Sequence, residues 1–101
     1  MAVSPSHAND NQTLTIRVEG RFDYSQHREF REAYRDVYTP GMQVIVDLSN
    51  TEYMDSSALG MLLLLREHAG GDDAKVVLKQ PTEAIRKILD IAHFEQLFTI
   101  D

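Results

Sequence analysis

An aspartate and two adjacent serines stand where a polar loop gives way to a leucine-rich run. Asp55, Ser56 and Ser57 follow a strand-like stretch at residues 44–48 and precede the apolar residues of a predicted helix. A serine hydroxyl at the start of a helix can cap the free amide groups of the first turn. The same position favours a phosphoryl group, because the helix dipole and the unpaired amides attract anions. The choice between these two roles decides the function.

The predicted helix after Asp55 carries two separate stripes. At 100° per residue, one stripe is fully apolar and is expected to face the sheet; it consists of Ala58, Met61, Leu62, Leu65 and Ala69. The second consists of Ser56, Gly60, Leu63 and Glu67, with Leu59 along one edge and Leu64 farther round. A serine at the head of a partly apolar, solvent-facing stripe suits a protein interface gated by phosphorylation. A well-packed helix whose serine only caps it fits the pattern equally well.

The rest of the chain predicts the elements that position this helix. Residues 13–18 alternate apolar and polar side chains, which predicts a half-buried strand that stops at Gly20. Residues 44–48 form a nearly continuous β-branched run, typical of a central strand covered on both faces. Residues 75–78 and 97–100 predict two further strands. Around them, amphipathic patterns predict a helix near residues 28–37, capped by Asp23 or Ser25, and a helix capped by Thr82.

The element order is strand, helix, strand, helix, strand, helix, strand. This order predicts an α/β fold, with helices packed on a sheet of parallel strands. With 101 residues the chain is long enough for one domain. We expect residues 1–11 to form a flexible N-terminal arm or a short edge strand, and residues 12–101 to form the domain.

Composition narrows the class of partner. The formal net charge of −6 argues against binding to nucleic acid or anionic lipid, so a protein partner is expected. The absence of cysteine excludes disulfides, thiolate nucleophiles and cysteine-ligated zinc. Residues 1–11 lack the pattern of a secretory signal, and no apolar run reaches membrane-spanning length. We therefore expect a cytoplasmic protein without direct membrane insertion.

The sequence contains no motif typical of a catalytic site or a metal site. Ser56 lacks the Gly-x-Ser-x-Gly elbow expected of a hydrolase nucleophile, so no enzymatic activity is predicted. Asp72 and Asp73 lack the further oxygen ligands of a cation loop. The histidines show no ligand spacing on a shared face, so no metal and no cofactor are predicted; they are His7, His27, His68 and His93.

Two other acidic residues deserve separate interpretations. Asp47, at the end of the predicted central strand, is interpreted as a structural anchor for the following loop in preference to a partner contact. Asp23 can cap a helix and line a site at the same time.

Residues 53–62, after the strand at 44–48, resemble the sequence motif of bacterial anti-sigma factor antagonists, the STAS-domain family. Residues 20–23 resemble that family's first strand-to-helix junction. The resemblance extends over residues 13–100 and looks closest to the HsbA-like subgroup, which acts in partner switching for biofilm and motility. It implies the STAS fold: a single α/β domain with a mixed, mostly parallel sheet of four to five strands and helices packed on it.

The resemblance also implies a mechanism. Family members bind an anti-sigma factor, and often a serine kinase, while their motif serine is unmodified; phosphorylation releases them, and a PP2C-type phosphatase restores binding. Ser56 matches that serine, and Ser57 is the second-ranked acceptor. The predicted partner-binding residues are Asp23, Asp55, Ser56, Ser57, Leu59, Gly60, Leu63, Leu64 and Glu67. Ala58 stands where many members have glycine, and the sequence stops at Asp101, before the last helix of many members.

Two other functions compete with this one. A STAS subunit of a lipid or solute transporter would dock the same helix permanently on a nucleotide-binding ATPase, without any phosphate. A ligand-sensing module would need an enclosed pocket, for which the sequence gives no sign.

Overall fold

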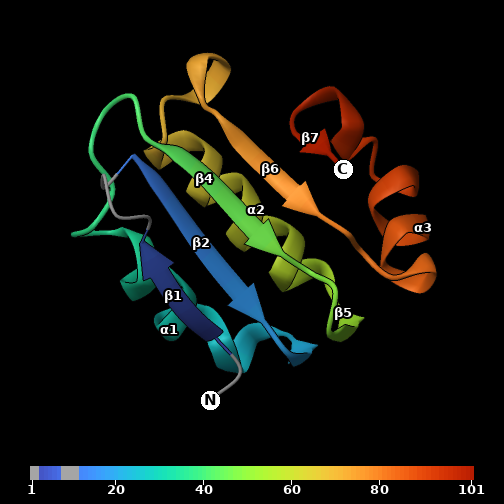
Figure 1. The fold of residues 1–101 in the computed structure, drawn as a ribbon. Coiled ribbons are helices and arrows are strands. Elements are labelled where there is room, and N and C mark those ends of the chain that lie inside the picture. The colour runs from blue at the N-terminus through green and yellow to red at the C-terminus, as the bar shows by residue number, and fades with distance from the viewer. Residues whose placement is uncertain (1–2, 8–11) are drawn as a thin grey trace.

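The computed structural model describes residues 3–7 and 12–101 (Figure 1). In this part of the chain five strands form the main sheet, and β1 and β2 pair antiparallel whereas all other neighbours pair parallel. The spatial order is β1 (Val3–His7), β2 (Thr13–Val18), β4 (Gln43–Asp47), β6 (Val76–Lys79) and β7 (Thr99–Ile100). The predicted mixed, mostly parallel sheet is confirmed, and β4 is its central strand.

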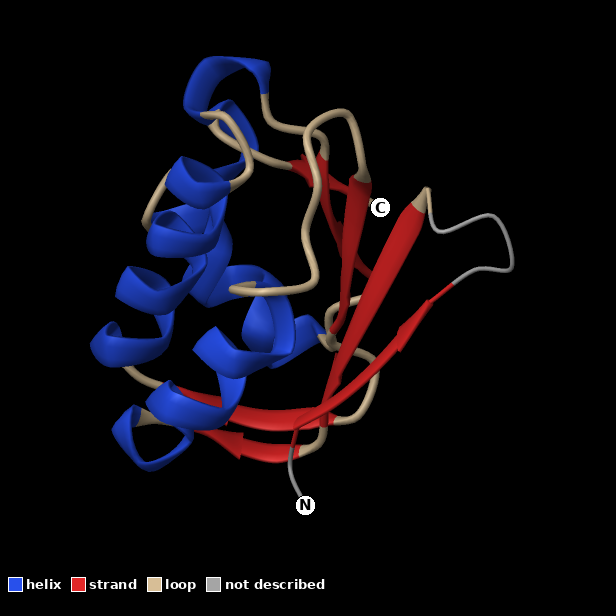
Figure 2. Cartoon of the chain, turned by 90° about the vertical axis from the view of Figure 1, so that its left-hand side faces the viewer, coloured by secondary structure: helices blue, strands red, loops and turns tan. Residues whose placement is uncertain are grey.

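The helices lie on one face of this sheet (Figure 2). They are α1 (His27–Tyr34), α2 (Ser56–His68) and α3 (Glu83–Ile91). A 3-10 turn flanks each helix: η1 (Tyr24–Gln26) precedes α1, η2 (Gly71–Asp73) follows α2, and η3 (Phe94–Gln96) follows α3. Thr82 caps α3 as predicted, because its hydroxyl accepts a hydrogen bond from the Ile85 amide at 3.3 Å. The last strand is shorter than predicted, since residues 97–98 precede it.

The prediction that β4 is covered on both faces is wrong, because the helices cover only one of its faces. Burial alternates along this strand: Val44 and Val46 are buried under the helices, whereas Ile45 and Asp47 are only half-buried on the opposite face. A β-branched residue also suits an open sheet face, because neighbouring strands cover half of its surface. A continuous β-branched run therefore does not require a second layer.

A second, two-stranded parallel sheet lies beyond the carboxyl ends of β2 and β4. We call it the β3–β5 ribbon, after its strands β3 (Gly20–Phe22) and β5 (Thr51–Met54). The turn at Gly20, with φ of +74°, brings its amide to the Asn50 carbonyl at 3.0 Å. The buried Thr51 hydroxyl donates to the Val18 carbonyl at 2.8 Å. Both strands stand where the sequence indicated only a turn and a polar loop.

The core lies between the helices and the main sheet. The apolar stripe predicted for α2 is confirmed, since all five of its members are buried; they are Ala58, Met61, Leu62, Leu65 and Ala69. After α2, Gly70 adopts a left-handed φ of +116°, which ends the helix. The position of α2 against the sheet fixes which of its residues point outward.

The predicted N-terminal arm is described in part. Residues 3–7 form β1 at the edge of the sheet, and residues 1–2 and 8–11 of the arm lie outside the described residues. Among the residues described, no helix has the length and apolar character needed to cross a membrane.

Asp47 ends β4 with its carboxylate turned into the following loop. It accepts hydrogen bonds from the Ser49 amide at 3.0 Å and the Ser49 hydroxyl at 2.7 Å, and Arg17 pairs with it at 3.5 Å. Burial alone would raise the pKa of the Asp47 carboxyl, but the hydrogen bonds from Ser49 and Arg17 outweigh it and hold this pKa below its usual range. These contacts match the interpretation of Asp47 as a loop anchor.

Candidate functional site

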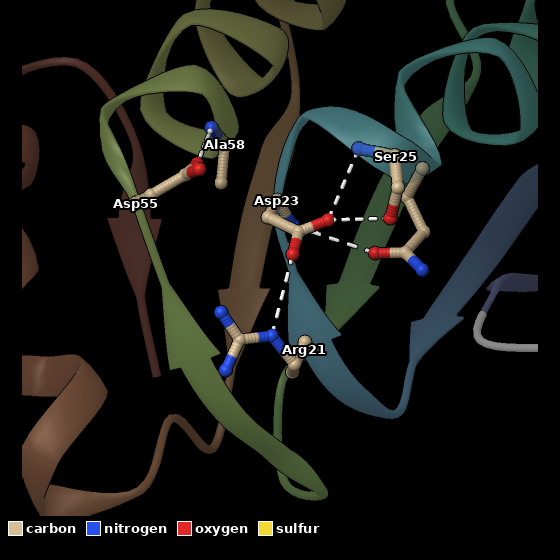
Figure 3. Close-up of polar contacts among 6 residues, drawn as sticks. Arg21, Asp23, Ser25, Asp55 and Ala58 are labelled. Carbon is tan, nitrogen blue, oxygen red and sulfur yellow. Dashed lines mark hydrogen bonds and ion pairs between the residues drawn. The ribbon is translucent and has the colours of Figure 1, made fainter.

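The β3–β5 ribbon brings together two junctions, at Asp23 and Asp55, that are 32 residues apart in the sequence. Phe22 pairs with Met54 in the parallel register, and the Asp55 amide donates to the Phe22 carbonyl at 3.4 Å. Because parallel strands end at the same edge, the residues that follow them, Asp23 and Asp55, lie side by side (Figure 3). The starts of η1 and α2 therefore share one edge.

At the carboxyl end of the ribbon, residues that pair across the two strands have the same burial. Phe22 and Met54 point into the core, and the Phe22 ring lies 5.1 Å from the Phe30 ring. Arg21 and Tyr53 lie on the exposed side, together with the half-buried Asp23 and Asp55. The buried pair anchors the ribbon, and the exposed side presents polar and aromatic groups to solvent.

Asp55, not Ser56, caps α2. The Asp55 carboxylate accepts a hydrogen bond from the Ala58 amide at 2.9 Å, and Ser56 is the first helical residue. The capping role that the sequence allowed for Ser56 is thus wrong, because the helix begins at Ser56 itself, one residue earlier than that role requires. The Ser56 side chain is exposed and its hydroxyl makes no hydrogen bond to any of the described residues, whereas Ser57 is half-buried.

Replacing Asp55 with alanine should lower the free energy of unfolding by about 1 kcal/mol, because the Ala58 amide loses its acceptor. Asp55→Asn, which keeps a capping oxygen, should lose less than half of that. Urea unfolding of the three proteins measures the difference. Equal losses for the alanine and asparagine variants would show that the cap does not stabilise α2.

Asp23 caps η1, the 3-10 turn that leads into α1, whereas α1 itself follows Gln26 without a side-chain cap. Asp23 also lies at the shared edge, where its role as a site residue stays a prediction. Its carboxylate accepts hydrogen bonds from the Ser25 hydroxyl and, at 3.0 Å, from the Ser25 amide, and it pairs with Arg21 at 3.3 Å. The Ser25 hydroxyl is the main reason why the pKa of the Asp23 carboxyl lies below its usual range; the Ser25 amide and Arg21 add to this effect. Asp23 is therefore an anion at neutral pH.

Below Ser56, the outward side of α2 carries the second stripe. We call Ser56, Gly60, Leu63 and Glu67 the outer stripe. A side chain at Gly60 would meet nothing within 4 Å, so this position is an open notch. Leu63 is 38% exposed and Leu64, farther round, is 61% exposed. Leu59 is half-buried against the core, and Glu67 is exposed.

Sequence reasoning missed Arg21 and Tyr53 as site residues. The Arg21 guanidinium carbon lies 4.1 Å from the centre of the Tyr53 ring, which places a cation on the exposed side of the ribbon. Arg21 and Tyr53 each begin a triplet of a polar, an apolar and a polar residue, at residues 21–23 and 53–55. That pattern could have indicated two short half-buried strands ending in aspartate.

The histidines of the described residues are dispersed. His27 stacks on Tyr24 at 4.8 Å, His68 packs near Tyr34 at 5.1 Å, and His93 lies 3.8 Å from a Glu95 oxygen. Within residues 3–7 and 12–101, no three carboxylate, imidazole or thiol side chains gather where they could hold a metal ion. The side chain of His7 lies outside the description.

The sequence has a family match over nearly its whole length. The family model described as "Mlab, STAS domain" matches residues 6–99. A STAS-domain containing protein of Pseudomonas aeruginosa (strain UCBPP-PA14) is 51% identical over 100 residues, which cover 99% of this chain and 99% of that protein.

Solved structures resemble the fold at lower identity. The anti-sigma factor antagonist SpoIIAA in its unphosphorylated form superposes with a TM-score of 0.82 at 18% identity, covering 99% of this chain and 88% of that one. The Bacillus cell fate determinant SpoIIAA in its phosphorylated form gives a TM-score of 0.69 at 18% identity, covering 99% and 91%. At this identity the likeness concerns the fold.

Proposed function

The chain belongs to the STAS-domain family, and on that basis we propose that it is an anti-sigma factor antagonist controlled by phosphorylation of Ser56. In this proposal the unmodified protein binds an anti-sigma factor through the shared edge and the outer stripe. A serine kinase transfers phosphate to Ser56 and releases the partner, and a PP2C-type phosphatase reverses the step. The protein acts by binding, not by catalysis.

The observation that carries the proposal is that the Ser56 hydroxyl is accessible and takes no part in holding the fold. It is exposed at the first position of α2, and its hydroxyl has no partner among the described residues. The cap of α2 belongs to Asp55, so modification of Ser56 breaks no contact that holds the helix. The amides of the first turn and the helix dipole favour an anion at this position. A phosphate is thus compatible with the intact fold.

The surroundings of Ser56 explain how phosphate would release a partner. Asp55 precedes it directly, and Asp23 lies at the same edge, so the modified site combines two carboxylates with a phosphate of about −1.5 to −2 charges. A partner surface that fits a hydroxyl would meet like charge and a bulkier group. Such juxtaposition costs several kcal/mol at an interface, enough for at least a hundredfold loss of affinity.

The outer stripe supports a protein as the partner. Leu63 and Leu64 expose apolar surface on a helix of an otherwise acidic protein. The open notch at Gly60 lets a partner's backbone or side chain approach α2 closely. Apolar anchors beside charged groups are typical of specific protein interfaces.

Transfer of phosphate from ATP tests the acceptor site. Incubated with its serine kinase and ATP, the protein should gain one phosphate, which mass spectrometry maps to Ser56, and Ser56→Ala should gain none. Ser57→Ala is the matched control and should be modified like the unaltered protein. Efficient transfer to another residue with Ser56 unmodified would refute the assignment.

The competing function is constitutive docking of the same helix on a transporter ATPase. Permanent docking predicts that an acidic residue at Ser56 changes binding little and that no phosphate is found there. The placement within the HsbA-like subgroup, and with it a role in motility and biofilm, remains a prediction.

A further inference from the structure

Arg21 is held over the exposed side of the β3–β5 ribbon by two contacts. Its Nε atom pairs with the Asp23 carboxylate at 3.3 Å, and its guanidinium carbon lies 4.1 Å from the centre of the Tyr53 ring. Figure 3 shows the guanidinium between the two strands, on the side of Asp23 that faces β5. The cation is therefore positioned at the ribbon and does not extend freely into solvent.

Most of the hydrogen-bonding capacity of Arg21 is unused. Its side chain is 66% exposed, and within the described residues only Nε makes a hydrogen bond. The two terminal nitrogens retain a planar pair of donors, which matches the oxygens of a phosphate better than a lysine ammonium does.

The register places Arg21 opposite Tyr53, three residues before Ser56. Arg21 pairs with Tyr53, so the strand positions that follow bring Asp23 beside Asp55, and Ser56 comes next. Neighbouring strands lie about 4.8 Å apart, and Ser56 comes three residues after Tyr53, which is about 10 Å along the strand direction. The Arg21 guanidinium already extends along β3 to the Asp23 carboxylate, which covers part of that separation, and the phosphoserine side chain has to cover the rest.

We propose that Arg21 moves from Asp23 to the phosphate when Ser56 is phosphorylated, and so acts as an internal phosphate clamp. The inference rests on the proposed function, because it concerns the modified state of the same serine. The phosphate offers about twice the charge of the Asp23 carboxylate and accepts the guanidinium fork through two oxygens. Asp23 keeps its hydrogen bonds from Ser25 but loses its cation.

The clamp gives phosphorylation two effects on the surface that a partner meets. The Ser56 hydroxyl becomes an anion, and the Asp23 carboxylate changes from an ion-paired group to an uncompensated one. The second effect reaches across the ribbon to a strand that carries no modification. Arg21 is thus a positioning residue for the switch.

The test uses full-length protein with phosphoserine incorporated at position 56 during translation, so no kinase is needed. Phosphorus NMR at increasing pH gives the second pKa of the phosphate. In the protein with Arg21 this pKa should lie below the usual value of about 6, and Arg21→Gln should raise it by about 0.5 to 1. Arg21→Lys should fall between the two, because it retains the charge without the fork.

Arg35→Gln is the matched control, since Arg35 is half-exposed at the far end of α1 and pairs with Asp36. It should leave the phosphate pKa unchanged. The same pKa in the Arg21→Gln protein as in the unaltered phosphoprotein would overturn the clamp. That outcome is distinct from failure of the proposed function, which would appear as absence of kinase transfer to Ser56 and would leave the titration unaffected.

Discussion

Ser56→Asp should reduce affinity for the anti-sigma factor at least a hundredfold, which corresponds to about 2.7 kcal/mol. The added carboxylate stands beside Asp55 and Asp23, where a partner that fits a hydroxyl meets uncompensated negative charge. The fold should persist, because Asp55 holds the cap. An acid in the first turn even favours the helix, by about 0.3 to 1 kcal/mol. Calorimetric titration gives the affinity, and thermal unfolding by circular dichroism checks the fold.

Two variants serve as controls for this result. Ser56→Ala removes the acceptor without adding charge and should bind like the unaltered protein. Gln96→Asp places the same charge at an exposed position of η3, outside the predicted partner-binding residues, and should retain most of the affinity. A Ser56→Asp protein that is folded and binds within threefold of the original would favour constitutive docking over the phosphorylation switch.

Phe22→Ala should lower the free energy of unfolding by about 3 to 5 kcal/mol. The Phe22 side chain is fully buried under the ribbon and packs against Phe30, so its removal leaves a cavity. In a domain of this size each kcal/mol lowers the melting temperature by about 4 to 8 °C, so the expected decrease is about 12 °C or more. Urea and thermal unfolding both measure the change.

The size of this loss depends on volume, and the ribbon offers matched comparisons. Phe22→Leu retains most of the buried volume and should cost less than about 1.5 kcal/mol. Glu52→Ala, at an exposed position of β5, should stay within about 0.5 kcal/mol of the original. A loss below 1 kcal/mol for Phe22→Ala would mean that the ribbon is not anchored through this side chain.

The inward face of α2 could be predicted because its information is local. Apolar residues spaced three and four apart specify one helix face, and the sheet covers that face in the structure. The outer stripe follows from the same projection, and the exposure of Leu63 agrees with it. By contrast, the choice of cap between Asp55 and Ser56 depends on a shift of one residue, and both residue types are good caps.

The β3–β5 ribbon could not be predicted in the same way. Each strand has only three or four residues, and the two pair across about thirty residues of intervening chain. Its hydrogen bonds, such as that from Thr51 to Val18, are equally non-local. The contact between Arg21 and Tyr53 exists only because of this pairing. Half of the candidate site thus depends on long-range contacts that no local pattern encodes.

The central claim is that phosphate on Ser56 decides whether the anti-sigma factor is bound. The most direct test compares unmodified protein with protein carrying phosphoserine at position 56, each titrated calorimetrically against the anti-sigma factor that the unmodified protein recovers from its native host. The recovered protein must itself bind a sigma factor. We expect tight binding by the unmodified form and at least a hundredfold weaker binding by the phosphorylated form. Equal affinities of the two forms would contradict the switch.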